Sequence, residues 1–166
     1  AEKHAPKAEI NLTVKDLRRY ISSTSILDST HMMCQAGKIP KRIQVLCDAL
    51  LLHPIIRLRQ SKMVVSGMAI GNFTHVARHY VRKMLINSRN IDRRVLFITY
   101  VGMNEEKLRY IRSLVQQYCP FERVYLQKAS SAVASNCGPG SFGLLFMKKN
   151  DAVISYSEAS DPNETA

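Results

Sequence analysis

The sequence contains no long apolar run and no targeting signal. A membrane-spanning helix needs about 18 or more uninterrupted apolar residues, and the longest candidate, residues 43–56, is interrupted by Asp48 and His53. The first ten residues, AEKHAPKAEI, lack the apolar segment of a secretory signal. With 46% hydrophobic and 22% charged residues, the composition is that of a globular protein. We therefore expect a cytoplasmic protein of one domain.

The sequence lacks any C-x-x-C motif. The four thiols are Cys34, Cys47, Cys119 and Cys137, all far apart in the chain. This spacing does not fit a zinc site or a disulfide framework. We expect four reduced thiols, with Cys34, Cys47 and Cys119 filling space in the core. Cys137 has no obligate base beside it in the sequence, so a catalytic thiol is not expected there.

Catalytic and metal-binding signatures are absent too. The sequence has no P-loop, no G-x-S-x-G, no G-x-G-x-x-G after a strand and no H-E-x-x-H motif. His75 and His79 stand four residues apart and could share a metal ion on a helix. However, Arg78, Arg82 and Lys83 surround them, and their charge would repel a cation. We therefore expect neither a metal site nor an enzyme.

Charge is strongly biased towards the basic side. The net charge is +11, and four acids (Asp151, Glu158, Asp161, Glu164) follow Lys149 without any basic residue. The rest of the chain is therefore more basic than the whole. Such a balance favours an anionic partner, which could be nucleic acid, a phosphorylated group, an acidic protein face or a membrane surface.

Periodicity predicts a mixed α/β (α+β) domain over residues 13–149, with helices packed on a sheet of roughly six strands. Residues 1–12 are expected to be a flexible lead-in, and residues 150–166 an acidic disordered tail. We predict helices at 13–21, 29–37, 40–50, 73–87 and 104–118. The predicted strands cover 24–28, 54–60, 63–71, 93–102, 122–128 and 141–147, with a loop before the last one.

The segment NCGPG, residues 136–140, directly precedes the last predicted strand. Gly138 and Gly140 can adopt positive φ and bring the backbone close to another atom. Two interpretations remain open on this pattern alone. The segment is either a tight turn that starts a strand or a loop that contacts a ligand.

Four segments together resemble the DegV family. SNCGPGSFGLLF is similar to the C-terminal signature of that family, which reads as alanine or serine, then histidine, then a small residue, followed by GPG and an apolar strand. TSILDSTHMMCQAGKIPKR resembles its strand, short helix and Gly-Arg-Ile segment. LHPIIRLRQSKMVVSGMAIG resembles its paired strands, and NEEKLRYIRSLVQQYCPFERVYL resembles the helix and strand before the signature. The resemblance covers about residues 13–149 and corresponds to the C-terminal domain of the family only.

The resemblance implies a non-enzymatic fatty-acid-binding protein. Members hold a long acyl chain between an N-terminal and a C-terminal domain, and in some bacteria the complex serves a fatty-acid kinase. By this resemblance, the ligand-binding residues near the lipid head group would be Gly37, Lys38, Asn136, Cys137, Gly138, Pro139 and Gly140. Met32 and Met33 would contribute to an apolar pocket for the tail, and no cofactor besides the fatty acid is implied.

The sequence departs from the family pattern at several positions, one of them near Ile70 or Gly71, where the family often has an arginine. Asn136 stands where the signature has a histidine and cannot titrate. Lys38 stands where the family usually has an arginine, so bidentate contact with a carboxylate is lost. These changes weaken the case for handing acyl groups to a kinase more than the case for holding an apolar chain.

The alternative is a basic interaction module that binds nucleic acid or an acidic protein partner. It would use Lys38, Lys41, Arg42, Arg78, Arg82 and Lys83. No nucleic-acid motif is present, and aromatic residues are poorly interleaved with the basic ones. Nucleic acid is therefore the less expected ligand.

Overall fold

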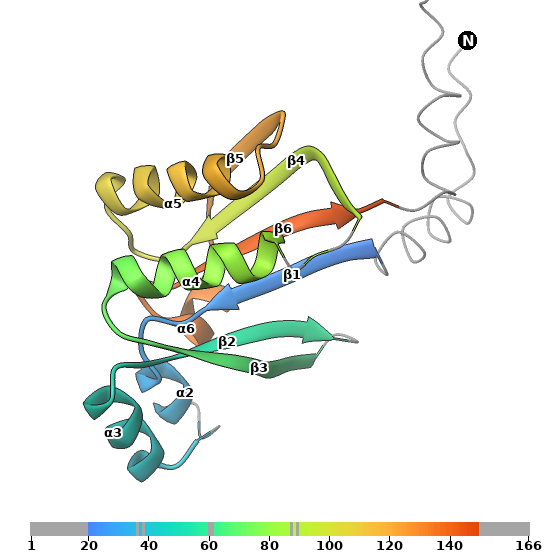
Figure 1. Cartoon of the computed structure of the whole chain (residues 1–166). Coiled ribbons are helices and arrows are strands. Elements are labelled where there is room, and N and C mark those ends of the chain that lie inside the picture. The colour runs from blue at the N-terminus through green and yellow to red at the C-terminus, as the bar shows by residue number, and fades with distance from the viewer. Residues whose placement is uncertain are drawn as a thin grey trace, which may run out of the picture.

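The computed structural model describes residues 20–35, 37, 39–59, 62–86, 88 and 90–149. The predicted lead-in, the predicted tail and residues 13–19 of the first predicted helix lie outside these ranges. The elements (Figure 1) are β1 (Ile21–Ile26), α2 (His31–Gln35), α3 (Lys41–Ala49), β2 (Leu52–Arg59), β3 (Lys62–Ile70), α4 (Phe73–Ile86), β4 (Ile91–Tyr100), α5 (Glu105–Tyr118), β5 (Arg123–Lys128), α6 (Ser131–Cys137) and β6 (Phe142–Lys148).

The described strands form one mixed sheet in the order β3-β2-β1-β6-β4-β5. All neighbouring strands are antiparallel except β4 and β5, which are parallel and are joined by the crossover helix α5. The predicted sheet of about six strands packed by helices is thus confirmed. Strand β6 comes last in sequence but lies between β1 and β4, so it joins the two halves of the sheet.

The main core lies between the sheet and the helices α4 and α5, which pack against each other on one face (Figure 1). We call this the covered face. Because residues opposite each other in a ladder share a face, the register places its strand residues together. Its central members are Thr24, Ile26, Leu96, Ile98, Phe142, Leu144 and Phe146, all buried.

Tyr80 of α4 is the largest fully buried side chain and links this helix to the sheet. Its hydroxyl lies 2.8 Å from Thr24 Oγ1, and it accepts a hydrogen bond from the Leu144 amide at 3.3 Å. Its ring meets Phe142 edge to face, with centroids 5.2 Å apart. Burial raises the pKa of the Tyr80 hydroxyl well above its usual range, so the group stays neutral.

The start of α5 agrees with the sequence prediction. Asn104 is the N-cap, and its Oδ1 accepts a hydrogen bond from the Lys107 amide at 3.0 Å. Glu105 and Glu106 occupy the first turn, where the helix dipole favours negative charge. Within the described ranges, no helix is both long and apolar enough to cross a membrane.

Two predicted elements were wrong in part. Ile21 was expected to end a helix, but it begins β1 and pairs with Met147 of β6. The predicted loop before the last strand contains helix α6, which follows Ser130 as N-cap. Both errors have the same cause, because short segments take their conformation from tertiary pairing and packing rather than from periodicity.

We expect the buried hydroxyl pair of Tyr80 and Thr24 to be energetically coupled. Tyr80→Phe should destabilise the protein by about 1–3 kcal/mol, because it leaves the Thr24 hydroxyl and the Leu144 amide without this partner. Thr24→Val in the Tyr80→Phe background should cost less than in the wild type. Urea unfolding measures each value, with Tyr118→Phe at a half-buried site as the control. Additive losses would contradict the coupling.

Candidate functional site

The glycine loop after α6 is fixed by its own backbone. Gly138 and Gly140 have φ values of 76° and 80°, which confirms that the motif needs residues able to adopt positive φ. The Gly138 amide donates to Ala134 O at 2.9 Å, and the Gly140 amide donates to Val101 O at 2.8 Å. These two N–H groups are therefore occupied, and a ligand would have to use other donors.

Side chains from two other elements pack directly on this loop. A Cβ at Gly140 would lie 2.6 Å from Asp28 Oδ2, and one at Gly138 would lie 2.9 Å from Met32 Cγ. The Ser141 hydroxyl donates to Cys137 O at 2.7 Å and accepts from the Asp28 amide at 3.1 Å. The loop thus joins the ends of β1 and α6 to the start of β6.

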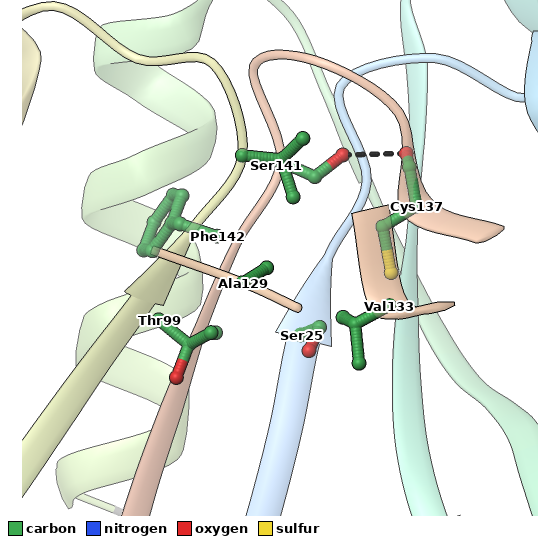
Figure 2. Close-up of a pocket in the computed structure, with 9 residues that line it drawn as sticks. Ser25, Thr99, Ala129, Val133, Cys137, Ser141 and Phe142 are labelled. Carbon is green, nitrogen blue, oxygen red and sulfur yellow. Dashed lines mark hydrogen bonds between the residues drawn. The ribbon is translucent and has the colours of Figure 1, made fainter. Parts of the chain in front are cut away.

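A small hollow lies beneath α6 on the sheet face opposite α4 and α5, which we call the open face. The ladder places Ser25, Gly143 and Thr99 side by side across β1, β6 and β4. Because these residues are small, they leave a cavity of about 20 Å³, enough for about one water molecule. Its lining (Figure 2) comprises Ser25, Thr99, Val101, Ala129, Val133, Cys137, Ser141, Phe142 and Gly143.

Polar and apolar groups meet in this hollow. Figure 2 shows Ser25 and Thr99 on the strands, with Val133 and Cys137 contributed by α6. Within the described part, the hydroxyls of Ser25 and Thr99 have no hydrogen-bond partner. They can therefore donate to a polar or anionic group that enters the hollow. The lining contains no histidine, aspartate or glutamate that could act as a general base.

The open face becomes apolar beyond the hollow. The next row across the sheet contains Ser23, Leu145 and Phe97. Phe97 stacks on Tyr125 of β5 with ring centroids 5.3 Å apart, and Tyr125 is 45% exposed. Other apolar side chains of this face are also exposed, namely Ile21, Leu58, Val65, Met68 and Ile70. A polar hollow therefore opens onto an apolar surface.

The structure brings some of the predicted site residues together. Met32 contacts Gly138, and Met33 packs against a small cluster of Leu27, Ile56 and Cys137 beside the hollow. Cys137 is buried and lines the hollow. The Asn136 amide nitrogen donates to Ala132 O of its own helix at 2.7 Å.

Other predicted residues are not joined to this cluster. Gly37 follows α2 in the left-handed region (φ 68°), and none of the described residues beyond its chain neighbours lies within 4 Å of the place where its Cβ would be. Lys38 lies outside the described residues. Arg78, Arg82 and Lys83 lie on α4, on the covered face, and so on the opposite side of the sheet from the hollow.

The sequence analysis did not predict that Ser25, Thr99 and Val133 would line a site. Their proximity depends on the register of three strands and on the position of α6. One signal was available in ISSTSI, where Ser23 and Ser25 alternate with residues of the covered face. Among the described residues, no cluster of three or more His, Cys, Asp or Glu side chains could hold a metal ion.

Two glycines with similar φ values, Gly37 (68°) and Gly140 (80°), allow the packing of the loop to be tested. Gly37→Ala should cost about 1 kcal/mol, because only the positive φ is strained. Gly140→Ala should cost about 2–4 kcal/mol, because the new methyl group also displaces Asp28. Urea unfolding of both variants gives the difference. Equal losses would show that contact with Asp28 does not constrain the loop.

A family model described as "uncharacterised protein, DegV family" matches residues 1–149. No curated protein matches the chain.

Solved structures share the fold at low sequence identity. A DegV family protein from Eubacterium eligens loaded with heptadecanoic acid has a TM-score of 0.70 at 18% identity, with 87% of this chain and 51% of that chain covered. The fatty acid kinase B3 protein of Streptococcus pneumoniae, loaded with linoleic acid, gives 0.71 at 9%, with 87% and 50% covered. A fatty-acid-binding DegV family protein from Thermus thermophilus gives 0.69 at 18%, with 89% and 52% covered.

The chain therefore spans about half the length of these structures. The resemblance in the sequence is confirmed by the family match, which covers most of the chain. With its fold and its glycine loop in place, the chain belongs to the DegV family.

Proposed function

We propose that this chain binds a long-chain fatty acid on its open face, with the carboxylate at the hollow beneath α6. The observation that carries the proposal is the junction of the free hydroxyls of Ser25 and Thr99 with an exposed apolar sheet face. Family membership supports the same ligand, because relatives with this fold are described with heptadecanoic and linoleic acid.

The size of the hollow decides where the acyl chain would lie. A volume of about 20 Å³ holds about one water molecule and not a hydrocarbon chain. The chain would therefore leave the hollow between Ser25 and Thr99 and run over Leu145 and Phe97. Each buried CH₂ contributes about 0.8 kcal/mol, so contact with this apolar row would supply most of the affinity.

The head-group region in this proposal includes the predicted residues around the glycine loop. Asn136 and the 138–140 loop would border the carboxylate. As the family resemblance implies, Lys38, next to Gly37 in the sequence, would supply a cation. Because the amides of Gly138 and Gly140 are occupied, hydroxyls and the Lys38 ammonium would be the main donors. Met32 and Met33 would form the apolar wall next to the loop.

We also propose that a second domain closes over the open face, as the length of the solved relatives suggests. These relatives are about twice as long as the matched region. Helix α3 buries Cys47 and exposes Ile43, Val45 and Leu46, so the chain offers further apolar surface to a partner. The proposed domain bounds are residues 13–149, with a cytoplasmic location.

The proposal describes a binding protein and not an enzyme. Among the described residues, the lining of the hollow includes no histidine, aspartate or glutamate. Presentation of the fatty acid to a kinase partner is supported by the name of the Streptococcus pneumoniae relative. None of the relatives named above is described as a nucleic-acid-binding protein.

Native mass spectrometry of the purified chain tests lipid binding directly. We expect an adduct of fatty-acid mass that organic extraction removes, and uptake of heptadecanoic acid by the extracted protein. A chain that remains bare after incubation with heptadecanoic and linoleic acid would contradict binding by this half alone.

Two exposed isoleucines provide a matched test of the face that binds. Ile21 lies on the open face and Ile86 on α4, and they are 42% and 54% exposed. Ile21→Glu, and more strongly Leu145→Glu, should weaken uptake at least tenfold, because a carboxylate would be desolvated against the acyl chain. Ile86→Glu should leave uptake unchanged. Equal uptake by all three variants would place the lipid elsewhere.

A further inference from the structure

Asp28 places a carboxylate beside the hollow. This residue follows the end of β1 by two positions and is exposed. A Cβ at Gly140 would lie 2.6 Å from Asp28 Oδ2 and 2.7 Å from Asp28 Cγ, so the carboxylate rests directly on the glycine loop. The next residue of the loop, Ser141, lines the hollow. The carboxylate therefore contacts the immediate neighbour of a lining residue.

Backbone hydrogen bonds hold Asp28 in this position. Its amide donates to Ser141 Oγ at 3.1 Å, and the Ser141 hydroxyl in turn donates to Cys137 O at 2.7 Å. Leu27, directly before Asp28, is buried, and its amide donates to Pro54 O at 3.0 Å. The carboxylate thus projects from a backbone that is bound both to β2 and to the mouth of the hollow.

The charge of this carboxylate is not balanced by a neighbour in the described part of the chain. Within those ranges, Asp28 forms no ion pair, and its carboxylate accepts no hydrogen bond. The cations of α4, Arg78, Arg82 and Lys83, lie on the covered face and so on the other side of the sheet. A head group in the hollow therefore meets the negative charge of Asp28 from one side.

The polar groups of the hollow suit a neutral head group. The hydroxyls of Ser25 and Thr99 can each donate and accept a hydrogen bond, whereas the amides of Gly138 and Gly140 are occupied. A carboxylate can only accept, but a primary amide or an alcohol can do both. Such a head group would use both properties of the two hydroxyls and could also donate to Asp28.

We propose that the site beneath α6 also takes acyl chains with an uncharged polar head group, an amide or an alcohol, and binds them at least as tightly as the free fatty acid. Asp28 is the residue that sets this preference. The inference rests on the proposed function, because it concerns the same site and the same acyl chain.

Two electrostatic effects act against the free acid. A carboxylate loses more favourable hydration than a neutral head group when it enters the hollow. It also meets the like charge of Asp28, which repels it. Because Asp28 is exposed, water and salt screen this repulsion. We therefore expect Asp28 to change the affinity for the acid by a factor of roughly three to ten.

Three ligands of equal carbon number separate the head group from the chain, namely heptadecanoic acid, heptadecanamide and heptadecanol. Titration of the extracted protein at about pH 8, where a carboxylic acid is ionised, followed by native mass spectrometry, gives the three dissociation constants. We expect the amide and the alcohol to bind at least as tightly as the acid. A preference for the acid of about tenfold or more would overturn the proposal, because a cation would then outweigh Asp28.

Asp28→Asn removes the charge with little change of shape. It should raise the affinity for heptadecanoic acid roughly threefold to tenfold, and this gain should shrink at about 1 M salt. The affinity for heptadecanol should stay the same. Glu122→Gln is the matched control, because it removes the same charge next to Arg93, at the opposite end of β4 from Thr99, and it should change neither affinity. Equal gains for the acid and the alcohol would refute the role of Asp28.

The outcomes separate this inference from the proposed function. If the wild type binds the acid and Asp28→Asn binds it equally well, the proposed function stands and the role of Asp28 fails. If the wild type takes up none of the three ligands, both fail. The comparison of the three ligands uses the wild-type chain, so it decides the head-group preference even if Asp28→Asn does not fold.

Discussion

The close approach of β1 and β6 at Gly143 is the constraint on which the rest of this structure depends. A Cβ at Gly143 would lie 2.6 Å from both Ser25 Oγ and Thr24 O, so no other residue fits without moving the strands apart. Strand β6 links the antiparallel half of the sheet to the half that contains β4 and β5. Because Gly143 has no side chain, it also leaves space for the hollow between Ser25 and Thr99. One glycine therefore supports both the continuity of the sheet and the shape of the candidate site.

The two faces of the sheet differ in how much of their apolar surface is buried. On the covered face, α4 and α5 bury a continuous core that includes Tyr80, Leu144 and Ile98. On the open face, the described residues bury a small cluster around Leu27, Ile56 and Cys137, near α2 and α6. Large apolar side chains left in water cost free energy and usually mark a binding surface. The asymmetry is thus itself an argument that the open face serves a ligand or a partner.

The sequence predicted the long, periodic elements well. The buried stripe of α5, with Leu108, Ile111 and Val115, follows from helical spacing, and its cap follows from Asn104. The strand 141–147 and the positive φ of Gly138 and Gly140 were also predictable, because an apolar run and a Gly-Pro-Gly segment leave few alternatives.

The candidate site was harder to predict, because it is assembled by register. Ser25 and Thr99 are 74 positions apart in the sequence and meet only through their common neighbour Gly143. No local pattern encodes that meeting, since a shift of one residue would turn either hydroxyl to the other face. Helix α6 was not predicted because it is short and is stabilised by packing rather than by helix propensity. Its Cys137 is buried against Leu27 and Ile56.

Binding an acyl chain requires burial of its hydrocarbon surface, and the open face of this chain can bury one side of it only. Free energy from hydrocarbon burial scales with the surface removed from water, at about 25 cal/mol per Å². A chain that lies on Leu145 and Phe97 is covered on one side only, so it realises part of this energy. The rest of this free energy requires a second apolar surface that covers the acyl chain. Such a surface would also bury the exposed side chains of Ile21, Val65 and Met68. Under the proposed function, one partner domain would satisfy both demands. The affinity of the chain for lipid and its affinity for that domain would therefore be linked, because each adds apolar surface against which the other is buried.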